Sequence, residues 1–315
     1  MTLDFSGRVV AVTGAGRGIG RAYALLLGRL GAQVVVNDLG GSAKGTGGDP
    51  GPANEVVEEI RAAGGTAAAD ASDVSTPEGG AAVVETALRA FGRIDGLVNN
   101  AGNMIWAQLP ELDVATLDAV LDVHVRGSFN TIRAAWPHLV EQGYGRIVLT
   151  SSIGMLGMPD NLPYATAKAA MLGMANSLTA LAGKQDIRIN TIAPNAITRL
   201  AGKPEEGGEN RGFGEVPAMD PAAVAPMAAY LAHEACQVSG EVYAAGAGRF
   251  ARLFLAQTPG WVAADADHAA GTAAEVSLDD VAAHWDEINA EDGYYVPRDP
   301  VHWSRRYMAH LFPGR

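Results

Sequence analysis

The stretch "VVAVTGAGRGIGRA", residues 9–22, joins an apolar run to a glycine-rich turn and then to a helical pattern. Its glycines are spaced Gly14-x3-Gly18-x-Gly20, with Gly16 between the first two. After a strand, such a turn lets backbone N–H groups approach a pyrophosphate, and the positive end of the following helix adds to the attraction. The turn therefore predicts a dinucleotide site made by Gly14, Gly16, Arg17, Gly18, Ile19 and Gly20. A tight turn that binds no ligand is the alternative.

Asp38 ends the next apolar run, 24 residues after Gly14. In dinucleotide-binding folds an acid at this place accepts hydrogen bonds from the adenosine ribose, and its charge repels the 2′-phosphate of NADP. Asp38 therefore favours NAD as the cofactor. One alternative is that Asp38 only caps the glycine-rich loop that follows it. Arg17 argues against this preference for NAD, because an arginine in this turn can contact a phosphate.

Short β-branched runs alternate with longer helical patterns along the first 250 residues. We expect strands at 9–13, 34–37, 66–70, 94–99, 147–151, 187–192 and 241–244. We expect helices at 19–30, 53–63, 77–91, 116–140, 164–182 and 221–233. Continuously apolar strands in this alternation predict right-handed crossovers and a parallel sheet covered on both sides. The predicted fold class is therefore α/β: a doubly wound parallel sheet (Rossmann fold) of about seven strands with helices on both faces.

The alternation stops after residue 250, and the remaining chain predicts a C-terminal helical extension. Residues 277–290 form an amphipathic helical pattern, with Ser277 and Asp280 placed to cap its start. We therefore divide the chain into a Rossmann-type, NAD-binding catalytic domain, 1–250, and an extension, 251–315. The apolar face of the helix needs a partner, which is either the body of the same subunit or a neighbouring subunit.

Two glycine-rich segments interrupt the pattern, at 39–52 and at 201–217. The first directly follows the second strand and is expected to be a loop. The second is polar, and its position predicts a mobile lid.

Composition limits the possible partners. The 315-residue chain is 48% hydrophobic with a net charge of −12, which argues against nucleic acid or an anionic membrane as the main partner. Its single cysteine, Cys236, allows no internal disulfide, and no run of about 18 apolar residues predicts a membrane span. No secretory signal is recognisable at the start, so we expect a cytoplasmic protein that acts on a small molecule. No metal site is predicted.

Tyr164 and Lys168 are four residues apart, so one helix places both side chains on the same face. An unperturbed phenol has a pKa of about 10, and a nearby ammonium group stabilises the phenolate and lowers that pKa. Tyr164 could then exchange a proton with an alcohol or a ketone. Ser151, at the end of a predicted strand, would hydrogen-bond the same substrate oxygen. The three residues predict a catalytic site.

Taken together, these motifs resemble the short-chain dehydrogenases/reductases. The resemblance rests on Thr13-Gly-x3-Gly-x-Gly20, Asn99-Asn-Ala-Gly102, Ser151 and Tyr164-x3-Lys168, in that order along the chain. The family's spacing implies that Ser151, rather than Ser152, is the catalytic serine. It implies cofactor contacts at Asp73, Val74, Asn100, Ala101, Gly102, Tyr164, Lys168, Pro194, Ile197 and Thr198. It also implies a homodimer or homotetramer built on the 164–182 helix.

Several longer strings resemble one branch of this family, the (3R)-hydroxyacyl-CoA dehydrogenase units of type-2 multifunctional enzymes. Among them are "VVVNDLGG", "VVEEIRAAGG", "VHVRGSF", "RAAWPHL" and "NTIAPNA". The resemblance implies an NAD-dependent oxidoreductase whose substrate is an acyl-CoA thioester, and the acyl chain could be bulky or steroidal. A dehydrogenase for free hydroxysteroids or other small carbonyl compounds is the first alternative. A non-catalytic scaffold that binds the cofactor is the second.

Some positions depart from the general family pattern. The family's "N-V-x-G" is "HVRG" here, so His124 stands where an asparagine commonly holds a relay water. His124 either serves that relay or is a core histidine bonded to backbone. Asp73 contacts adenine or is only a helix-entry acid. Asn99 to Gly102 pass under the cofactor or only stabilise the central strand.

Overall fold

The computed structural model describes residues 3–198, 219–263 and 276–311 of the chain. Contacts divide it into two compact units, Met1–Arg252 and Leu253–Arg315, and each is described by itself. The predicted lid at 201–217 lies outside the described residues. No helix in the described part is long and apolar enough to cross a membrane.

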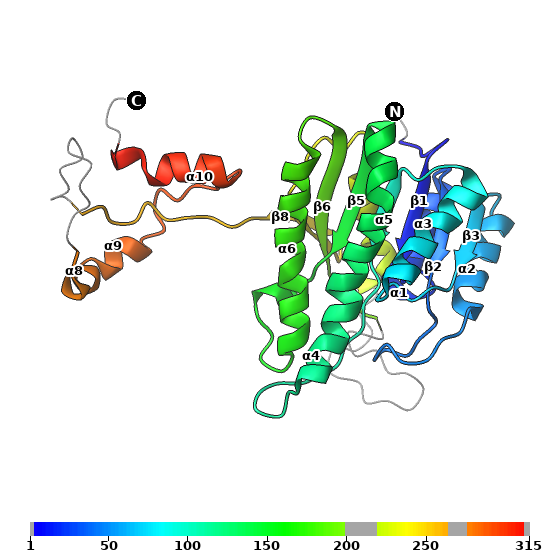
Figure 1. Ribbon diagram of the computed structural model, residues 1–315, viewed down its shortest axis with the longest axis horizontal. Coiled ribbons are helices and arrows are strands. Elements are labelled where there is room, and N and C mark those ends of the chain that lie inside the picture. The colour runs from blue at the N-terminus through cyan, green and yellow to red at the C-terminus, as the bar shows by residue number, and fades with distance from the viewer. Residues whose placement is uncertain (1–2, 199–218, 264–275, 312–315) are drawn as a thin grey trace. The chain divides into compact units, whose positions relative to one another are not determined.

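The first unit is built on an eight-stranded sheet in the order β3-β2-β1-β4-β5-β6-β7-β8 (Figure 1). The strands are β1 (Val9–Thr13), β2 (Gln33–Asn37), β3 (Thr66–Asp70), β4 (Gly96–Asn99), β5 (Tyr144–Thr150), β6 (Asp186–Pro194), β7 (Val242–Gly246) and β8 (Arg249–Leu253). Strands β3 to β7 pair in parallel. The order reverses between β1 and β4, and open α/β sheets bind ligands at the carboxyl ends of the strands at such a point.

The eighth strand, β8, was not predicted. Only Ala247 and Gly248 separate it from β7, and their φ angles are 50° and 73°. Two-residue turns with positive φ at both positions connect antiparallel strands, so β8 adds an antiparallel edge to the sheet. Alanine in the first turn position gave no hairpin signal, which is why sequence reasoning missed this strand.

Helices cover both faces of the sheet, as predicted (Figure 1). One face carries α1 (Gly18–Arg29), α2 (Gly51–Ala62) and α7 (Ala225–Ala232). The other carries α3 (Pro77–Phe91), α5 (Gly127–Gln142) and α6 (Leu162–Ala182). Strand β1 shows why its sequence is continuously apolar: Val10 and Val12 enter the core on the first face, while Val9 and Ala11 enter the core on the second.

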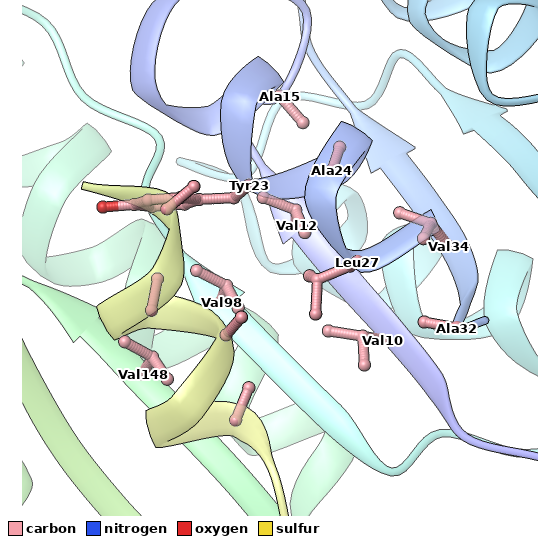
Figure 2. Packing of buried hydrophobic residues seen from close by; sticks show 14 of the residues in the cluster. Val10, Val12, Ala15, Tyr23, Ala24, Leu27, Ala32, Val34, Val98 and Val148 are labelled. Carbon is pink, nitrogen blue, oxygen red and sulfur yellow. The ribbon is translucent and has the colours of Figure 1, made fainter. Parts of the chain in front are cut away.

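The core on the first face contains the side chains that fix α1 against the sheet. Figure 2 shows Tyr23, Ala24 and Leu27 of α1 beside Val10 and Val12, with valines from neighbouring strands completing the layer. Tyr23 and Leu27 are each only 1% exposed. Burying the aliphatic side chain of Leu27 contributes about 1.5–3 kcal/mol relative to leaving it exposed. This packing sets the position of the helix that begins at the glycine-rich turn.

The helix predicted at 116–140 is one continuous run with a wider segment inside it. It consists of α4 (Val114–Leu121), a π-helical segment η1 (Asp122–Arg126) and α5. His124 lies in the π-helical segment and is buried. Single π-turns within helices often occur at functional sites.

The second unit contains α8 (Leu278–Ala283), α9 (Trp285–Asn289) and α10 (Pro300–Tyr307). The prediction of one helix over 277–290 is wrong, because His284 adopts φ −104° and ψ 15° and separates α8 from α9. The predicted cap is confirmed: Ser277 and Asp280 form a reciprocal capping box. None of the residues described in this unit is buried.

Candidate active site

Hydrogen bonds connect the glycine-rich turn after β1 to the segment that follows β4. Thr13 Oγ1 accepts hydrogen bonds from the backbone N–H groups of Asn100 and Ala101, both at 3.0 Å. Asn100 Nδ2 donates to the carbonyl oxygens of Thr13 and Gly14, both at 3.1 Å. Since β1 and β4 are parallel neighbours, their carboxyl ends meet here, and these bonds hold the turn in one conformation.

The glycines of the turn leave bare backbone where a side chain would not fit. Gly14 has a φ of 62°, and a Cβ there would lie 2.8 Å from Ala101 Cα. A Cβ on Gly16 would lie 2.8 Å from Asp38 Oδ2, and one on Gly20 would overlap the Gly14 carbonyl. Close approach of backbone is what a pyrophosphate needs, so this turn fits the diphosphate of a dinucleotide.

Asp38 follows β2 and bonds the turn on one side and the next loop on the other. Its Oδ2 accepts the Gly16 N–H and its Oδ1 accepts the Gly40 N–H, both at 2.7 Å. Asp38 therefore does cap the loop, and it also lines the cavity described below. Each carboxylate oxygen can accept more than one hydrogen bond, so ribose hydroxyls remain possible donors to it.

Residues 39–50, called the strap below, connect β2 to α2. The strap is tied to itself by Asp49 N donating to Leu39 O, at 2.8 Å. It is tied to the loop after β4 by Met104 N donating to Ala43 O, at 3.0 Å. The Arg17 guanidinium donates to the strap carbonyl of Gly41 at 3.3 Å.

A cavity of about 550 Å³ lies where these loops meet, at the switch point of the sheet. Pockets for cofactors and small molecules have this order of volume. Predicted cofactor residues that line it are Gly14, Arg17, Gly18, Ile19, Gly20, Asp38, Asp73, Val74, Asn100, Ala101, Gly102 and Thr198. Five predicted cofactor residues are not part of its lining, namely Gly16, Tyr164, Lys168, Pro194 and Ile197, and the predicted catalytic Ser151 is not part of it either.

Two residues with open alternatives make structural bonds in this region. Asp73 Oδ1 accepts the Ser75 N–H at 2.9 Å, as a helix-entry acid does, and Asp73 also lines the cavity. Asn99 Oδ1 accepts the Thr131 hydroxyl at 2.7 Å, which ties β4 to α5. Asp73 and Asn99 therefore both make the structural bonds that the sequence analysis gave as alternatives to a cofactor contact.

Tyr164 and Lys168 lie on one face of α6, as their spacing predicts. The helix begins at Leu162, and Asn161 caps it by accepting the Tyr164 N–H at 3.2 Å. Lys168 Nζ lies 5.4 Å from the centre of the Tyr164 ring and donates to the carbonyl oxygen of Thr150 at 2.8 Å. The lysine is buried, at 4% exposure. The end of β5 therefore holds the ammonium group beside the tyrosine.

Burial shifts the pKa of both residues against their charged forms. It lowers the pKa of Lys168 to about 7. It raises the pKa of Tyr164, and a hydrogen bond from the Ser152 side chain acts in the opposite direction but does not outweigh burial. The protein groups alone therefore do not lower the pKa of Tyr164, contrary to our expectation. A lysine with a pKa near 7 is only partly charged at neutral pH, which weakens its effect on the phenol.

The two adjacent serines have different partners. Ser151 is 1% exposed, and its Oγ donates to the carbonyl oxygen of Lys168 at 2.7 Å. Ser152 caps the short 3₁₀ helix η2 (Ile153–Leu156) by accepting the Gly154 N–H at 3.1 Å. The side chain of Ser152 also bonds Tyr164. Sequence spacing favours Ser151 as the catalytic serine. In the structure, however, the serine whose side chain bonds Tyr164 is Ser152.

His124 is a core histidine bonded to backbone, and its ring also lies against the ring of Tyr164. Its Nε2 is 2.8 Å from the carbonyl oxygen of Asn103, and its ring meets the Tyr164 ring edge to face at 5.6 Å. Burial lowers the pKa of His124 well below its usual value, and the charge of Lys168 lowers it further. A Cβ on Gly102 would overlap the His124 ring, so glycine is required beneath it. His124 is therefore a neutral imidazole at neutral pH.

Sequence reasoning did not assign several cavity residues. They lie mainly in the strap and in the segment after Gly102, and they include Asn37, Leu39, Ser42, Ala43, Lys44, Thr46, Asn103 and Ile105. The glycine-rich composition of 39–52 correctly predicted a loop for residues 39–50, whereas residues 51 and 52 already belong to α2. Nothing in that composition showed that the loop folds back onto the switch point.

Residues 8–206 match the protein family described as short chain dehydrogenase. The chain belongs to this family. Along 289 residues this short-chain dehydrogenase is 41% identical to Rv0148 of Mycobacterium tuberculosis, a protein described as a short-chain type dehydrogenase/reductase, covering 91% of this chain and 95% of that protein. It is 44% identical over 261 residues to the peroxisomal multifunctional enzyme type 2 of Mus musculus, covering 82% of this chain and 34% of the mouse enzyme.

A solved structure gives the same relationship in three dimensions. The full-length peroxisomal multifunctional enzyme type 2 of Drosophila melanogaster superposes with a TM-score of 0.80 at 30% identity. The superposition covers 98% of this chain and 50% of the fly chain. The short-chain dehydrogenase thus spans a third to a half of these multifunctional enzymes. The predicted resemblance to their hydroxyacyl-CoA dehydrogenase unit and the predicted Rossmann-type fold are confirmed.

Proposed function

We propose that this short-chain dehydrogenase interconverts a (3R)-3-hydroxyacyl-CoA and the corresponding 3-ketoacyl-CoA with NAD. The observation that carries the proposal is the pairing of Tyr164 with the buried Lys168 beside a glycine-lined cavity at the switch point. The 44% identity to the mouse multifunctional enzyme supports the acyl-CoA class of substrate.

The cavity residues fit NAD. The glycine-rich turn would hold the diphosphate, and Asp38 would accept the adenosine ribose hydroxyls while disfavouring a 2′-phosphate. When bound, NAD supplies the acceptor for the hydride that leaves the substrate carbon. Arg17 lines the same cavity, and its bond to the Gly41 carbonyl directs part of its hydrogen-bonding capacity away from a phosphate.

The chain's own residues would handle the proton. The Tyr164 phenolate takes the hydroxyl proton of the substrate as a general base and becomes a neutral phenol, and the charged form of Lys168 stabilises the phenolate before this transfer. Ser151 orients the substrate oxygen. Its hydroxyl donates to the Lys168 carbonyl, so it must rotate from that partner to donate to a substrate. His124, neutral and packed on the ring, keeps Tyr164 in place.

Apolar side chains beside the tyrosine support an acyl substrate. Ile153 and Leu156 of η2 are 55% and 76% exposed, and Leu162 at the start of α6 is 44% exposed. The same turn packs on the tyrosine, since a Cβ on Gly154 would lie 3.2 Å from Tyr164 Cε1. Exposed apolar surface next to a catalytic group suits the acyl chain or a steroid side chain.

We also propose a homodimer or homotetramer in which α6 forms part of the interface. Helices α5 and α6 carry exposed apolar side chains, among them Phe129 at 53% and Leu181 at 65% exposure. An interface between subunits at these helices would cover them. The extension from 251 to 315 is proposed to pack on the body or on a neighbouring subunit, and the cytoplasm is proposed as the location.

The test is NADH formation, measured by absorbance, with paired (3R)- and (3S)-hydroxyacyl-CoAs of several lengths, a steroid side-chain CoA thioester and free steroid alcohols. Turnover of the 3R thioesters alone is expected. Turnover of free steroid alcohols alone would contradict the acyl-CoA proposal and leave the catalytic residues in place. NADP replaces NAD in a second set of reactions, and equal rates with both would contradict the role given to Asp38.

A further inference from the structure

Asn103, directly after the Asn99-to-Gly102 motif, is a buried polar residue that contacts both halves of the site. It is 2% exposed. Both polar backbone groups of Asn103 contact His124. The Nε2 atom of His124 lies 3.2 Å from the backbone nitrogen of Asn103 and 2.8 Å from the carbonyl oxygen of Asn103. Either tautomer of the histidine therefore finds a partner in the same residue.

The side chain of Asn103 faces the strap and α4. Its Nδ2 donates to the Ala119 carbonyl at 3.0 Å and to the Lys44 carbonyl of the strap at 3.4 Å. The neighbouring Met104 N–H bonds Ala43 O at 3.0 Å, so the strap is fastened at two adjacent positions. A Cβ on Gly45 would lie 2.9 Å from Asn103 Nδ2, which shows how closely strap and amide are packed.

Stability alone does not account for an asparagine at this position. Among the described residues, its Oδ1 is a buried acceptor with no hydrogen-bond partner. An unpaired buried acceptor is unfavourable, and an apolar side chain of similar size would avoid it. The Asn103 amide instead lies in the wall of the cavity, between the strap and His124, the histidine that packs on Tyr164.

We propose that Asn103 is a positioning residue that latches the strap over the bound cofactor and sets the contact between His124 and Tyr164. The inference rests on the proposed function, because the cofactor occupies the cavity that the strap lines. Asn103 acts through its neighbours: the Lys44 carbonyl on one side and the His124 ring on the other. The strap is thereby coupled to the catalytic tyrosine.

The first experiment perturbs the latch from the strap and leaves Asn103 in place. Gly45 and Gly47 have nearly the same φ, 83° and 82°, but a Cβ on Gly47 meets nothing within 4 Å. Gly45→Ala and Gly47→Ala therefore carry matched backbone strain, and only Gly45→Ala displaces the strap from Asn103. NADH affinity is measured by fluorescence titration and NADH release by stopped flow. Gly45→Ala is expected to weaken binding about threefold to tenfold, the effect of losing one hydrogen bond, and to speed release.

Equal NADH affinities for the two glycine variants and the wild type would overturn the latch. Failure of the wild type to bind NADH or NADPH would instead overturn the proposed function, so the two failures are distinguishable. Asn103→Ala is expected to weaken NADH binding as Gly45→Ala does. In the double variant Gly45→Ala should have no further effect, because the contact it displaces is already gone.

A second readout separates positioning from a merely structural role. Asn103→Ala should lower kcat as well as NADH affinity, because the backbone that holds His124 loses its side-chain anchor. The matched control is Asn190→Ala, which removes a fully buried asparagine on β6 whose amide bonds the Val238 carbonyl at 2.8 Å. The control should lower thermal stability and leave kcat and NADH affinity unchanged. If Asn103→Ala behaves as the control does, Asn103 is structural and the proposal fails.

Discussion

Each end of strand β5 holds a buried cation, and the two cations differ in how completely their N–H donors are hydrogen-bonded. Arg146, near the amino end, is 0% exposed and fully hydrogen-bonded. Its guanidinium donates to the carbonyl oxygens of Gly145, Asp186, His233 and Glu234 and to the Asp186 carboxylate, at 2.8–3.3 Å. A buried charge with this many partners is compensated.

Lys168, at the carboxyl end, is buried with much less compensation. An ammonium group has three donors, and the described residues provide one acceptor, the Thr150 carbonyl. Burial consequently lowers its pKa to about 7. The charge of Lys168 is therefore easily changed by its surroundings.

The difference separates a structural cation on β5 from the proposed catalytic cation on α6, which is held at the carboxyl end of the same strand. At the amino edge, satisfied hydrogen bonds stabilise the fold. At the carboxyl edge, incomplete satisfaction leaves a group whose protonation can respond to a ligand, at a cost in stability. Substitutions at the two edges should therefore have separable effects on activity and on stability.

Tyr164→Phe should give the largest effect and act on activity alone. It removes the proposed base and keeps the ring that packs on His124, so kcat should fall about 10²- to 10⁴-fold. Thermal unfolding followed by circular dichroism should show an unchanged Tm. Activity within a few-fold of the wild type would contradict the assignment of Tyr164 as the base.

Arg146→Met should give the reverse result at the other end of β5. It leaves several buried acceptors without a donor and should lower the free energy of unfolding by about 3–5 kcal/mol. Urea denaturation measures this loss, while kcat per folded molecule should stay unchanged. A loss of kcat without a loss of stability would show that the comparison between the two edges is wrong.

Ser151 and Ser152, which follow the carboxyl end of β5, should differ in their effect on activity. Ser151→Ala removes the hydroxyl proposed to orient the substrate oxygen, and kcat should fall about 100-fold, as when an oxyanion donor is removed. Ser152→Ala removes only the cap of η2 and a bond to Tyr164, so kcat should fall about threefold to tenfold. Initial rates at saturating NAD decide between them, and a larger loss for Ser152→Ala would exchange their roles.

Lys168→Met should change stability by an amount that depends on pH. The pKa of Lys168 is lowered from 10.5 to about 7 in the folded protein, so between these pH values the unfolded chain binds the additional proton. Wild-type stability relative to Lys168→Met should therefore rise with pH across this window, by up to about 1.4 kcal/mol per pH unit. Chemical denaturation at pH 7, 8 and 9 measures the slope. A difference that is constant with pH would show that Lys168 keeps its charge in the folded protein.

Local sequence pattern predicted most of the fold. All seven predicted strands are present, because each is a short apolar run between turn-forming residues. The misses are local features that packing controls. Strand β8 follows an unusual Ala247-Gly248 turn, the π-helical segment interrupts an otherwise regular periodicity at His124, and His284 divides the tail helix.

The sequence by itself determined the glycine-lined turn, the position of Asp38 after β2, and the pairing of Tyr164 with Lys168. Each of these depends on spacing along the chain: a strand-to-helix turn, a strand end and a single helical turn. Their physical basis is local backbone geometry, which the sequence encodes directly.

Only the tertiary structure decided which groups those residues contact. Lys168 is bonded to Thr150 across 18 residues, and Asn103 joins the strap across 59 residues. No periodicity relates such partners, because they meet only where parallel strands end at one edge of the sheet. The depressed pKa of Lys168 and the latch at Asn103 follow from burial at that edge, and burial is a property of the folded chain.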